Sequence, residues 1–182
     1  MAGPTERLFV ALDLPAAARA ALAEFRGRAD PRVWRPVADE ALHITLAFLG
    51  HLPEGSSERA GAVVQACAGP ATDLALGRAL LLPPRRARVL TVEVEDRAGE
   101  LAGLQERVSA ALSEAGLFEP ERRAFRPHAT VARLRAGQRA PRELGIDGPE
   151  PVAFDGEAVT LYRSRLSRAG ARYEPLERVP LG

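Results

Sequence analysis

The sequence predicts an α+β fold made of two similar halves. Two segments, His43–Leu49 and His128–Leu134, are identical at their first, third, fifth and seventh residues and differ at every residue between. Because successive side chains of a strand point to opposite faces, identity at alternate positions indicates two strands that present the same residues on one face. Helical patterns occur between the predicted strands, and this mixture favours the α+β class.

The composition is typical of one globular domain. The chain has 182 residues, 46% of them hydrophobic, and we expect a single two-lobed domain over residues 1–182. No apolar run approaches the roughly 20 residues that span a bilayer, and no signal region follows the N terminus. We therefore expect a soluble, cytoplasmic, monomeric protein with no membrane partner. Cys67 is the only cysteine, which excludes an internal disulfide and a cysteine-based zinc site.

The formal net charge of +1 neither favours nor excludes a nucleic-acid partner. All 25 basic residues are arginine, a bias that reflects the coding composition of a genome more simply than a function. The placement of the arginines is more informative, since a planar guanidinium suits phosphate oxygens. The cluster of Arg85, Arg86 and Arg88 either contacts a nucleic-acid backbone or faces water. A second group surrounds the second copy of the repeat and comprises Arg122, Arg123, Arg126, Arg133, Arg135, Arg139 and Arg142.

The first half begins with a predicted strand and helix. The run Leu8–Leu12 is continuously apolar, as in a buried strand. Pro15 suits the first position of a helix, and the alanine-rich stretch after it predicts a helix to about Arg28. Trp34–Pro36 is predicted to be extended, because proline disfavours the helical region for the residue before it.

The first copy of the repeat predicts a strand over His43–Leu49. A turn is expected at Gly50–Gly55. Ser56 or Ser57 is then expected to cap a second helix that ends at about Ala68.

The second half is predicted to contain two strands and a helix before the second copy of the repeat. The strands cover residues 73–82 and 88–95, and the second alternates apolar and polar residues, as in a half-solvated antiparallel strand. Apolar residues recur at helical spacing from Leu101 to Ala115, and Gly116 suits the left-handed end of that helix.

The segment after the repeat is predicted to be a loop followed by two strands. Residues 138–151 are rich in proline and glycine. The strands are expected over residues 152–163 and 172–179, with a turn at 167–170 between them.

The repeat carries two of the three histidines of the chain. If its strands pair across a pseudo-two-fold axis, His43 and His128 share one face, each followed two residues later by a threonine. Imidazole titrates near neutral pH, so one histidine can take a proton from an attacking oxygen while the other protonates a leaving oxygen. The hydroxyls of Thr45 and Thr130 can donate hydrogen bonds to the non-bridging oxygens of a phosphate. The pattern predicts in-line displacement at phosphorus.

Arg133 is a further candidate for binding the phosphate. It follows His128 by five residues and therefore falls on the opposite face of a regular strand. To contact the same phosphate, it must reach round from the strand end or from a twist. The third histidine, His51, lies just past the first predicted strand, in a turn.

Other chemistries have weaker support in the sequence. A catalytic zinc usually takes three protein ligands, and neither copy of the repeat supplies a third ligand at suitable spacing, so we expect no metal. There is no Gly-x-Ser-x-Gly elbow for a serine nucleophile. No Walker loop or dinucleotide fingerprint is present, so we expect no cofactor.

These residues resemble the two-histidine phosphoesterase superfamily, and within it the bacterial and archaeal RNA 2′,3′-cyclic phosphodiesterases, long named 2′-5′ RNA ligases. The resemblance runs nearly from end to end. It is carried by the two motifs, Leu42–Gly50 and Phe125–Arg133, by the opening strand Arg7–Pro15, and by the closing hairpin, Leu161–Leu166 followed by Gly170–Leu176.

The resemblance implies a bilobal fold in which two antiparallel sheets, with helices on the outside, face each other across a central groove. It implies hydrolysis of a terminal 2′,3′-cyclic phosphate on RNA to a 2′-phosphate without a metal. By position, His43 resembles the proton donor to the leaving 3′ oxygen, and His128 the proton acceptor that activates water. The roles of the two histidines could be exchanged in a pseudo-symmetric site.

The resemblance also extends to residues that bind the substrate. Thr45 and Thr130 match the threonines that hold the phosphate, and Arg133 matches the arginine after the second motif. Phe48 matches an aromatic residue that packs against a nucleobase. Strand parity places Phe48 opposite the face of His43, so a role in the core is equally open.

Three readings of this site stay open at the level of sequence. The first is hydrolysis of RNA ends, with tRNA fragments among the conceivable partners. The second is a module that binds a nucleotide or an RNA end without turnover. The third is the reverse chemistry, in which a cyclic phosphate and a 5′-hydroxyl are joined through a 2′-5′ linkage; water competes with this reaction, so hydrolysis is expected to dominate.

Overall fold

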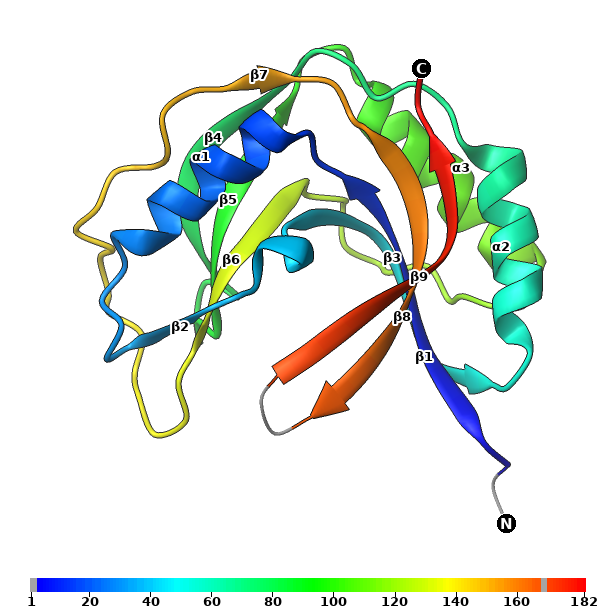
Figure 1. The fold of residues 1–182 in the computed structure, drawn as a ribbon, viewed down its shortest axis with the longest axis horizontal. Coiled ribbons are helices and arrows are strands. Elements are labelled where there is room, and N and C mark those ends of the chain that lie inside the picture. Colours follow the sequence, from blue (N-terminus) through cyan, green and yellow to red (C-terminus); the bar gives the residue numbers. More distant parts are fainter. Residues whose placement is uncertain (1–2, 168–169) are drawn as a thin grey trace.

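The computed structural model describes residues 3–167 and 170–182 of the chain. Its helices and strands follow the predicted order (Figure 1). The first half comprises β1 (Thr5–Asp13), α1 (Ala16–Gly27), β2 (Trp34–Pro36), a 3₁₀ turn (Asp39–Ala41), β3 (His43–Pro53) and α2 (Ser56–Cys67). The second half comprises β4 (Leu74–Leu82), β5 (Val89–Asp96), α3 (Glu100–Glu114), β6 (His128–Leu134), β7 (Ala153–Phe154), β8 (Ala158–Ser167) and β9 (Gly170–Pro180).

The strands of the described residues form one curled antiparallel sheet. Its order is β7-β4-β5-β6-β3-β1-β8-β9, and β2 pairs with the outer part of β6. The two halves of the sheet meet at β3 and β6, where Ile44 and Ala129 are the paired residues. The α+β class is confirmed, and the two sheets expected from the resemblance are joined along this seam.

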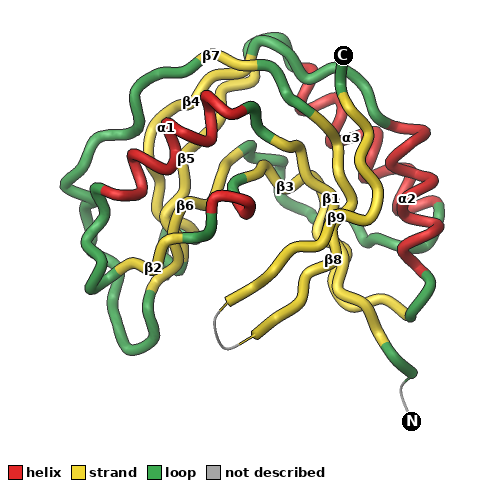
Figure 2. Tube along the Cα trace, in the orientation of Figure 1, coloured by secondary structure: helices red, strands yellow, loops and turns green. Residues whose placement is uncertain are grey.

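The helices pack against the sheet on its outer sides (Figures 1 and 2). Helix α1 contacts β6 and β7, and α3 contacts β3 and β5. Helix α2 packs beside α3 and against β8 and β9. Among the described residues, no helix is both long and apolar enough to cross a membrane.

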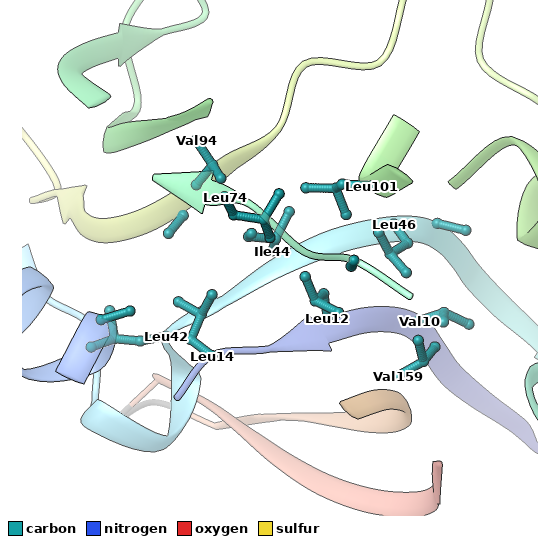
Figure 3. Close-up of a cluster of buried hydrophobic side chains, with 14 of the residues drawn as sticks. Val10, Leu12, Leu14, Leu42, Ile44, Leu46, Leu74, Val94, Leu101 and Val159 are labelled. Atoms are coloured by element: carbon teal, nitrogen blue, oxygen red, sulfur yellow. The ribbon is translucent and has the colours of Figure 1, made fainter. Parts of the chain in front are cut away.

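One hydrophobic core lies between the sheet and the helices. Figure 3 shows Leu12 and Ile44 of adjacent strands packed near Leu101 of α3, and all three side chains are 0% exposed. At roughly 2 kcal/mol for a fully buried leucine or isoleucine, such side chains supply most of the energy that holds the halves together. The core thereby fixes the relative position of the two copies of the repeat.

Two predicted boundaries in the first half are wrong. Strand β3 runs to Pro53, so the turn is shorter than the predicted Gly50–Gly55. Gly55, with φ of 88°, is the residue that precedes α2, and no serine caps this helix; the first-turn amide of Ser57 donates to Oε1 of Glu6 at 2.7 Å. The Ser56 hydroxyl instead donates a hydrogen bond to the carbonyl of Pro53 at 2.7 Å. A left-handed glycine turn replaces the serine cap, because glycine adopts positive φ without steric cost.

The strand predicted over residues 152–163 is divided into β7 and β8. Gly156 lies in the break, and its amide donates to the carbonyl of Ala71 at 2.8 Å. A Cβ atom at this position would lie 2.6 Å from Cδ1 of Leu12, so only glycine fits against the core here. The turn predicted at residues 167–170 includes residues 168–169, which lie outside the described residues.

Candidate active site

The two copies of the repeat meet in a groove of about 440 Å³ on the inner face of the sheet. Strand β3 brings His43, Thr45 and Phe48 to its wall, and β6 brings His128, Thr130 and Arg133. The structure therefore places all six predicted site residues around one cavity. The Arg85, Arg86 and Arg88 cluster is exposed on the β4–β5 connection and does not line this groove.

Strand β3 contains a bulge directly after Thr45. The neighbouring residues Val10 and Ala11 of β1 lie opposite Ala47 and Thr45, so Leu46 is an extra residue between them. Leu46 and Ala47 are both buried. One extra residue reverses the alternation of side chains as far as Phe48, after which the pairing with β1 shifts again at Leu49.

The bulge brings Phe48 onto the groove face. The Phe48 side chain is 44% exposed and lines the groove together with His43. The guanidinium of Arg7 stacks over its ring, with Cζ 4.6 Å from the ring centroid. The prediction that Phe48 lies opposite the face of His43 is wrong, because it assumes a regular strand.

Strand β6 contains a bulge at the same place in its copy of the repeat. Thr91 and Leu90 of β5 lie opposite Thr130 and Ala132, so Val131 is the extra residue. Val131 and Ala132 are both buried. The bulge therefore follows the threonine of the motif in both halves.

The second bulge places Arg133 on the groove face with His128. The prediction that Arg133 starts from the opposite face is wrong for the same reason as for Phe48. The prediction that all four matched positions of the repeat share a face is also wrong. The histidine and threonine positions line the groove, whereas the alanines, Ala47 and Ala132, are buried in the core.

His43 belongs to a cluster of aromatic rings at the floor of the groove. Its imidazole stacks on Phe9, with ring centroids 5.0 Å apart, and lies nearly parallel to Tyr162 at 6.0 Å. The ring of Tyr173 meets it edge-on at 5.5 Å. This packing fixes the plane of the imidazole and removes most of its contact with water.

His128 is held by a hydrogen bond to the backbone. Its Nδ1 lies 2.7 Å from the carbonyl oxygen of Arg126, and since a carbonyl only accepts, Nδ1 carries the hydrogen. Nε2 of the neutral ring therefore carries the lone pair. The Arg126 guanidinium donates to Glu93, with Nη2 3.1 Å from Oε1. Burial raises the pKa of Glu93, but hydrogen bonds from Arg126 and Arg78 outweigh it and lower the pKa overall.

The 2′-5′ RNA ligase superfamily model matches residues 14–168. The chain belongs to this superfamily. Relatives include the RNA 2′,3′-cyclic phosphodiesterase of Escherichia coli, 32% identical over 180 residues that cover 95% of each chain. That of Aeropyrum pernix is 32% identical over 152 residues, which cover 80% of this chain and 85% of the relative. The family predicted from the two motifs is confirmed.

Two solved structures have the same fold as this chain. Escherichia coli LigT complexed with 3′-AMP superposes with a TM-score of 0.80 at 30% identity, covering 98% of this chain and 99% of LigT. The protein TT0787 of Thermus thermophilus has a TM-score of 0.76 at 33% identity, covering 96% of this chain and 97% of that one.

In this superfamily member each histidine lies opposite a carboxylate residue of the neighbouring strand. Asp13 of β1 is the register partner of His43, and Glu93 of β5 is the register partner of His128. The Asp13 carboxylate accepts hydrogen bonds from the hydroxyls of Thr160 at 2.8 Å and Tyr162 at 2.7 Å. Burial and the contact with Asp13 raise the pKa of Tyr162, so its phenol stays protonated and donates.

The electrostatic surroundings keep His43 neutral. Its pKa is lowered to about 4, chiefly by burial, with the positive charge of Arg133 and the proximity of His128 acting in the same direction and the carboxylate of Asp13 opposing them. At neutral pH the imidazole of the unliganded protein is therefore uncharged. Any negative charge that enters the groove raises this pKa.

The lowered pKa of His43 predicts a loss of stability in acid. An unfolded histidine protonates below about pH 6.5, whereas folded His43 stays neutral down to about pH 4, so acid favours the unfolded chain within this window. Protonation of His43 therefore lowers the free energy of unfolding by up to about 3 kcal/mol as the pH falls from 6.5 to 4. Urea unfolding should show that His43→Asn loses less stability than the native chain between these pH values. Parallel stability curves for the two proteins would contradict this assignment.

Sequence reasoning missed Phe9, Asp13, Glu93 and Tyr173. The apolar run Leu8–Leu12 gives no sign that Phe9 lines the groove, or that Asp13 just after it lies opposite His43. The polar face predicted for residues 88–95 contained Glu93, but nothing in the sequence paired it with His128. Among the described residues, no group of three or more histidine, cysteine, aspartate or glutamate side chains is arranged to hold a metal ion.

Proposed function

We propose that the protein is an RNA 2′,3′-cyclic phosphodiesterase that opens a terminal cyclic phosphate to a 2′-phosphate without a metal. The observation that carries the proposal is the pair of histidines, each with a threonine on the same face, in one groove between the two halves. The names of the relatives in Escherichia coli and Aeropyrum pernix agree with this activity.

In the proposed reaction, His128 is the proton acceptor and His43 the proton donor. Nε2 of His128 takes a proton from water, and the water oxygen forms a bond to phosphorus. The bond between phosphorus and the 3′ oxygen breaks in line with the attack, and the imidazolium of His43 gives its proton to that oxygen. The hydrogen bond from Nδ1 of His128 to the Arg126 carbonyl supports the first role, because it leaves Nε2 as the acceptor.

The donor role requires His43 to gain a proton when the substrate binds. In the unliganded protein its pKa is about 4. The negative charge of the bound phosphate, added to that of Asp13, raises this pKa and recruits the proton. The substrate would thus complete the acid–base pair.

Four further residues are proposed to bind the substrate. The hydroxyls of Thr45 and Thr130 donate hydrogen bonds to the non-bridging oxygens, where charge accumulates in the transition state. The Arg133 guanidinium compensates the same charge. Phe48, exposed and backed by Arg7, offers a ring face for stacking a nucleobase.

The same two histidines could run the ring opening in reverse with a 5′-hydroxyl in place of water. Opening of the strained ring by abundant water is expected to dominate. The physiological partner, such as a tRNA fragment, and the single-domain, monomeric and cytoplasmic character of the protein remain predictions from the sequence.

A product assay tests the proposed function. An oligonucleotide ending in a 2′,3′-cyclic phosphate should be converted to the 2′-phosphate at the same rate with and without EDTA. Products are separated by chromatography against synthetic 2′- and 3′-phosphate standards. A 3′-phosphate product, or loss of activity with EDTA, would contradict the proposed reaction; binding without turnover would identify a binding module.

A further inference from the structure

A second cavity of about 600 Å³ adjoins the groove that contains the histidines. Its walls come from α1, from β2 and its flanking residues, and from the start of β9 across the opening. Figures 1 and 2 show the β8–β9 hairpin extending toward the half of the sheet that contains β2. Arg35, Arg133 and Tyr173 line both cavities, so these residues form the junction between them.

Two arginines lie side by side at this junction. Arg35 of β2 and Arg133 of β6 are register partners in an antiparallel pair. Directly opposite residues of such a pair project to the same face, with Cα atoms about 5 Å apart. Like charges in this position are destabilising unless an anion lies between or beside them.

Neither guanidinium is compensated by an acid in the described part of the chain. Arg35 and Arg133 are exposed and make no ion pair or side-chain hydrogen bond with any described residue. Eight other arginines are paired with carboxylates, whereas Arg85, Arg86 and Arg88 also make no ion pair with a described residue but do not line a cavity; the eight are Arg26, Arg32, Arg78, Arg97, Arg126, Arg163, Arg165 and Arg178. Because Arg35 and Arg133 are adjacent, uncompensated and on the walls of both cavities, an anionic ligand would be favourable beside them.

We propose that Arg35 binds the phosphodiester on the 5′ side of the terminal nucleotide, while Arg133 faces the reacting cyclic phosphate. This subsite rests on the proposed function. The charge of Arg133 acts on His43, which places Arg133 toward the reaction centre. Arg35 lies one strand farther out, toward the second cavity.

The chemistry of the substrate determines the direction in which the RNA strand leaves the groove. A 2′,3′-cyclic phosphate ends the strand on its 3′ side, so the RNA leaves the groove only through the 5′ oxygen of the terminal nucleotide. The next phosphate is therefore the 5′ phosphodiester, and two adjacent guanidinium forks suit two successive phosphates. The second cavity, about 600 Å³, has the size of a small-molecule site and would hold the preceding nucleoside.

Three substrates and one substitution test this subsite. The values of kcat/KM are measured for a nucleoside 2′,3′-cyclic phosphate with a 5′-hydroxyl, the same compound with a 5′-phosphate, and a dinucleotide ending in the cyclic phosphate. The native protein should prefer the two substrates that carry the 5′ phosphate. In Arg35→Gln this preference should fall about tenfold or more, since a charge-assisted hydrogen bond to phosphate is lost. The dependence of the dinucleotide KM on salt should weaken by about one counterion.

Arg32→Gln is the matched control, because Arg32 is a nearby exposed arginine that is paired with Asp30 and does not line either cavity. It should leave the preference for the 5′ phosphate unchanged. Equal losses on all three substrates in Arg35→Gln would assign Arg35 to the reacting phosphate and overturn the subsite. An unchanged preference would overturn it as well. A native protein that opens none of the three substrates would instead refute the proposed function itself.

Discussion

His43→Ala and His128→Ala should each lower kcat on a cyclic-phosphate oligonucleotide by about 10²- to 10⁴-fold, the usual contribution of a positioned acid or base. Both histidines line the groove, and no other histidine does, since His51 is exposed on the far part of β3. His51→Ala is therefore the matched control and should retain native activity. Single-turnover measurements with excess protein separate loss of chemistry from loss of binding.

The two losses should differ when sulfur replaces the leaving 3′ oxygen. A thiolate leaves without a proton, so the donor histidine becomes dispensable while the acceptor histidine does not. His43→Ala should regain most of its activity on the thio substrate, whereas His128→Ala should stay impaired. The reverse pattern would exchange the two roles, and equal impairment on both substrates would contradict the acid–base pair.

Because alanine at position 43 also removes a ring from the aromatic cluster, folding needs a separate check. His43 stacks on Phe9 at 5.0 Å, and truncation leaves a gap on that ring. The far-UV circular dichroism of His43→Ala should match the native spectrum. His43→Asn, which keeps more of the volume, should show the same catalytic loss and the same response to sulfur.

The residue types of the site were predictable from the sequence, because chemistry and strand periodicity constrain them strongly. Two histidines in identical settings predicted an acid–base pair, and each threonine at i+2 was predicted on the same face. The histidine and the threonine of each pair are only two residues apart in the same strand, so their common face does not depend on how the strands pair. A regular pleat holds from His43 to Thr45 and from His128 to Thr130, and the structure places each pair together in the groove.

Positions beyond the bulges were not predictable in the same way. A bulge depends on how two strands align, and Leu46 and Val131 are ordinary apolar strand residues in both sequence patterns. Their effect is to turn Phe48 and Arg133 into the groove. The sixth position of the repeat holds Phe48 in one copy and Arg133 in the other. Both side chains line the groove, at equivalent places in the two halves.

Contacts between distant strands were also beyond the sequence. Asp13 and Arg178 are 165 positions apart, yet Nε of Arg178 lies 3.3 Å from Oδ2 of Asp13. Such pairing follows from the sheet order, in which β1 and β9 flank β8. Propensity and periodicity within single segments contain no information about that order.

Asp13→Asn should lower kcat/KM about tenfold near neutral pH and shift to lower pH the limb of the pH profile that reports the protonation of His43. The carboxylate of Asp13 raises the pKa of His43. Without this carboxylate the pKa of His43 falls below about 4, and the imidazole is harder to protonate. If His43 must carry a proton when the phosphate is bound, each unit by which its pKa falls reduces the competent fraction about tenfold. The substitution keeps the size of the side chain, so the packing of β1 against β3 is largely preserved.

The control for this variant follows from the shared partner Arg178, which contacts Asp13 at 3.3 Å and Glu157 at 2.9 Å. Glu157→Gln also removes a carboxylate from Arg178, but Glu157 is not among the charges that act on the pKa of His43. A merely structural role of the ion pairs would make both variants lose stability and activity alike, with unchanged pH profiles. A positioning role for Asp13 requires the pH limb to move in Asp13→Asn and to stay in place in Glu157→Gln, because of these two carboxylates only Asp13 acts on the pKa of His43.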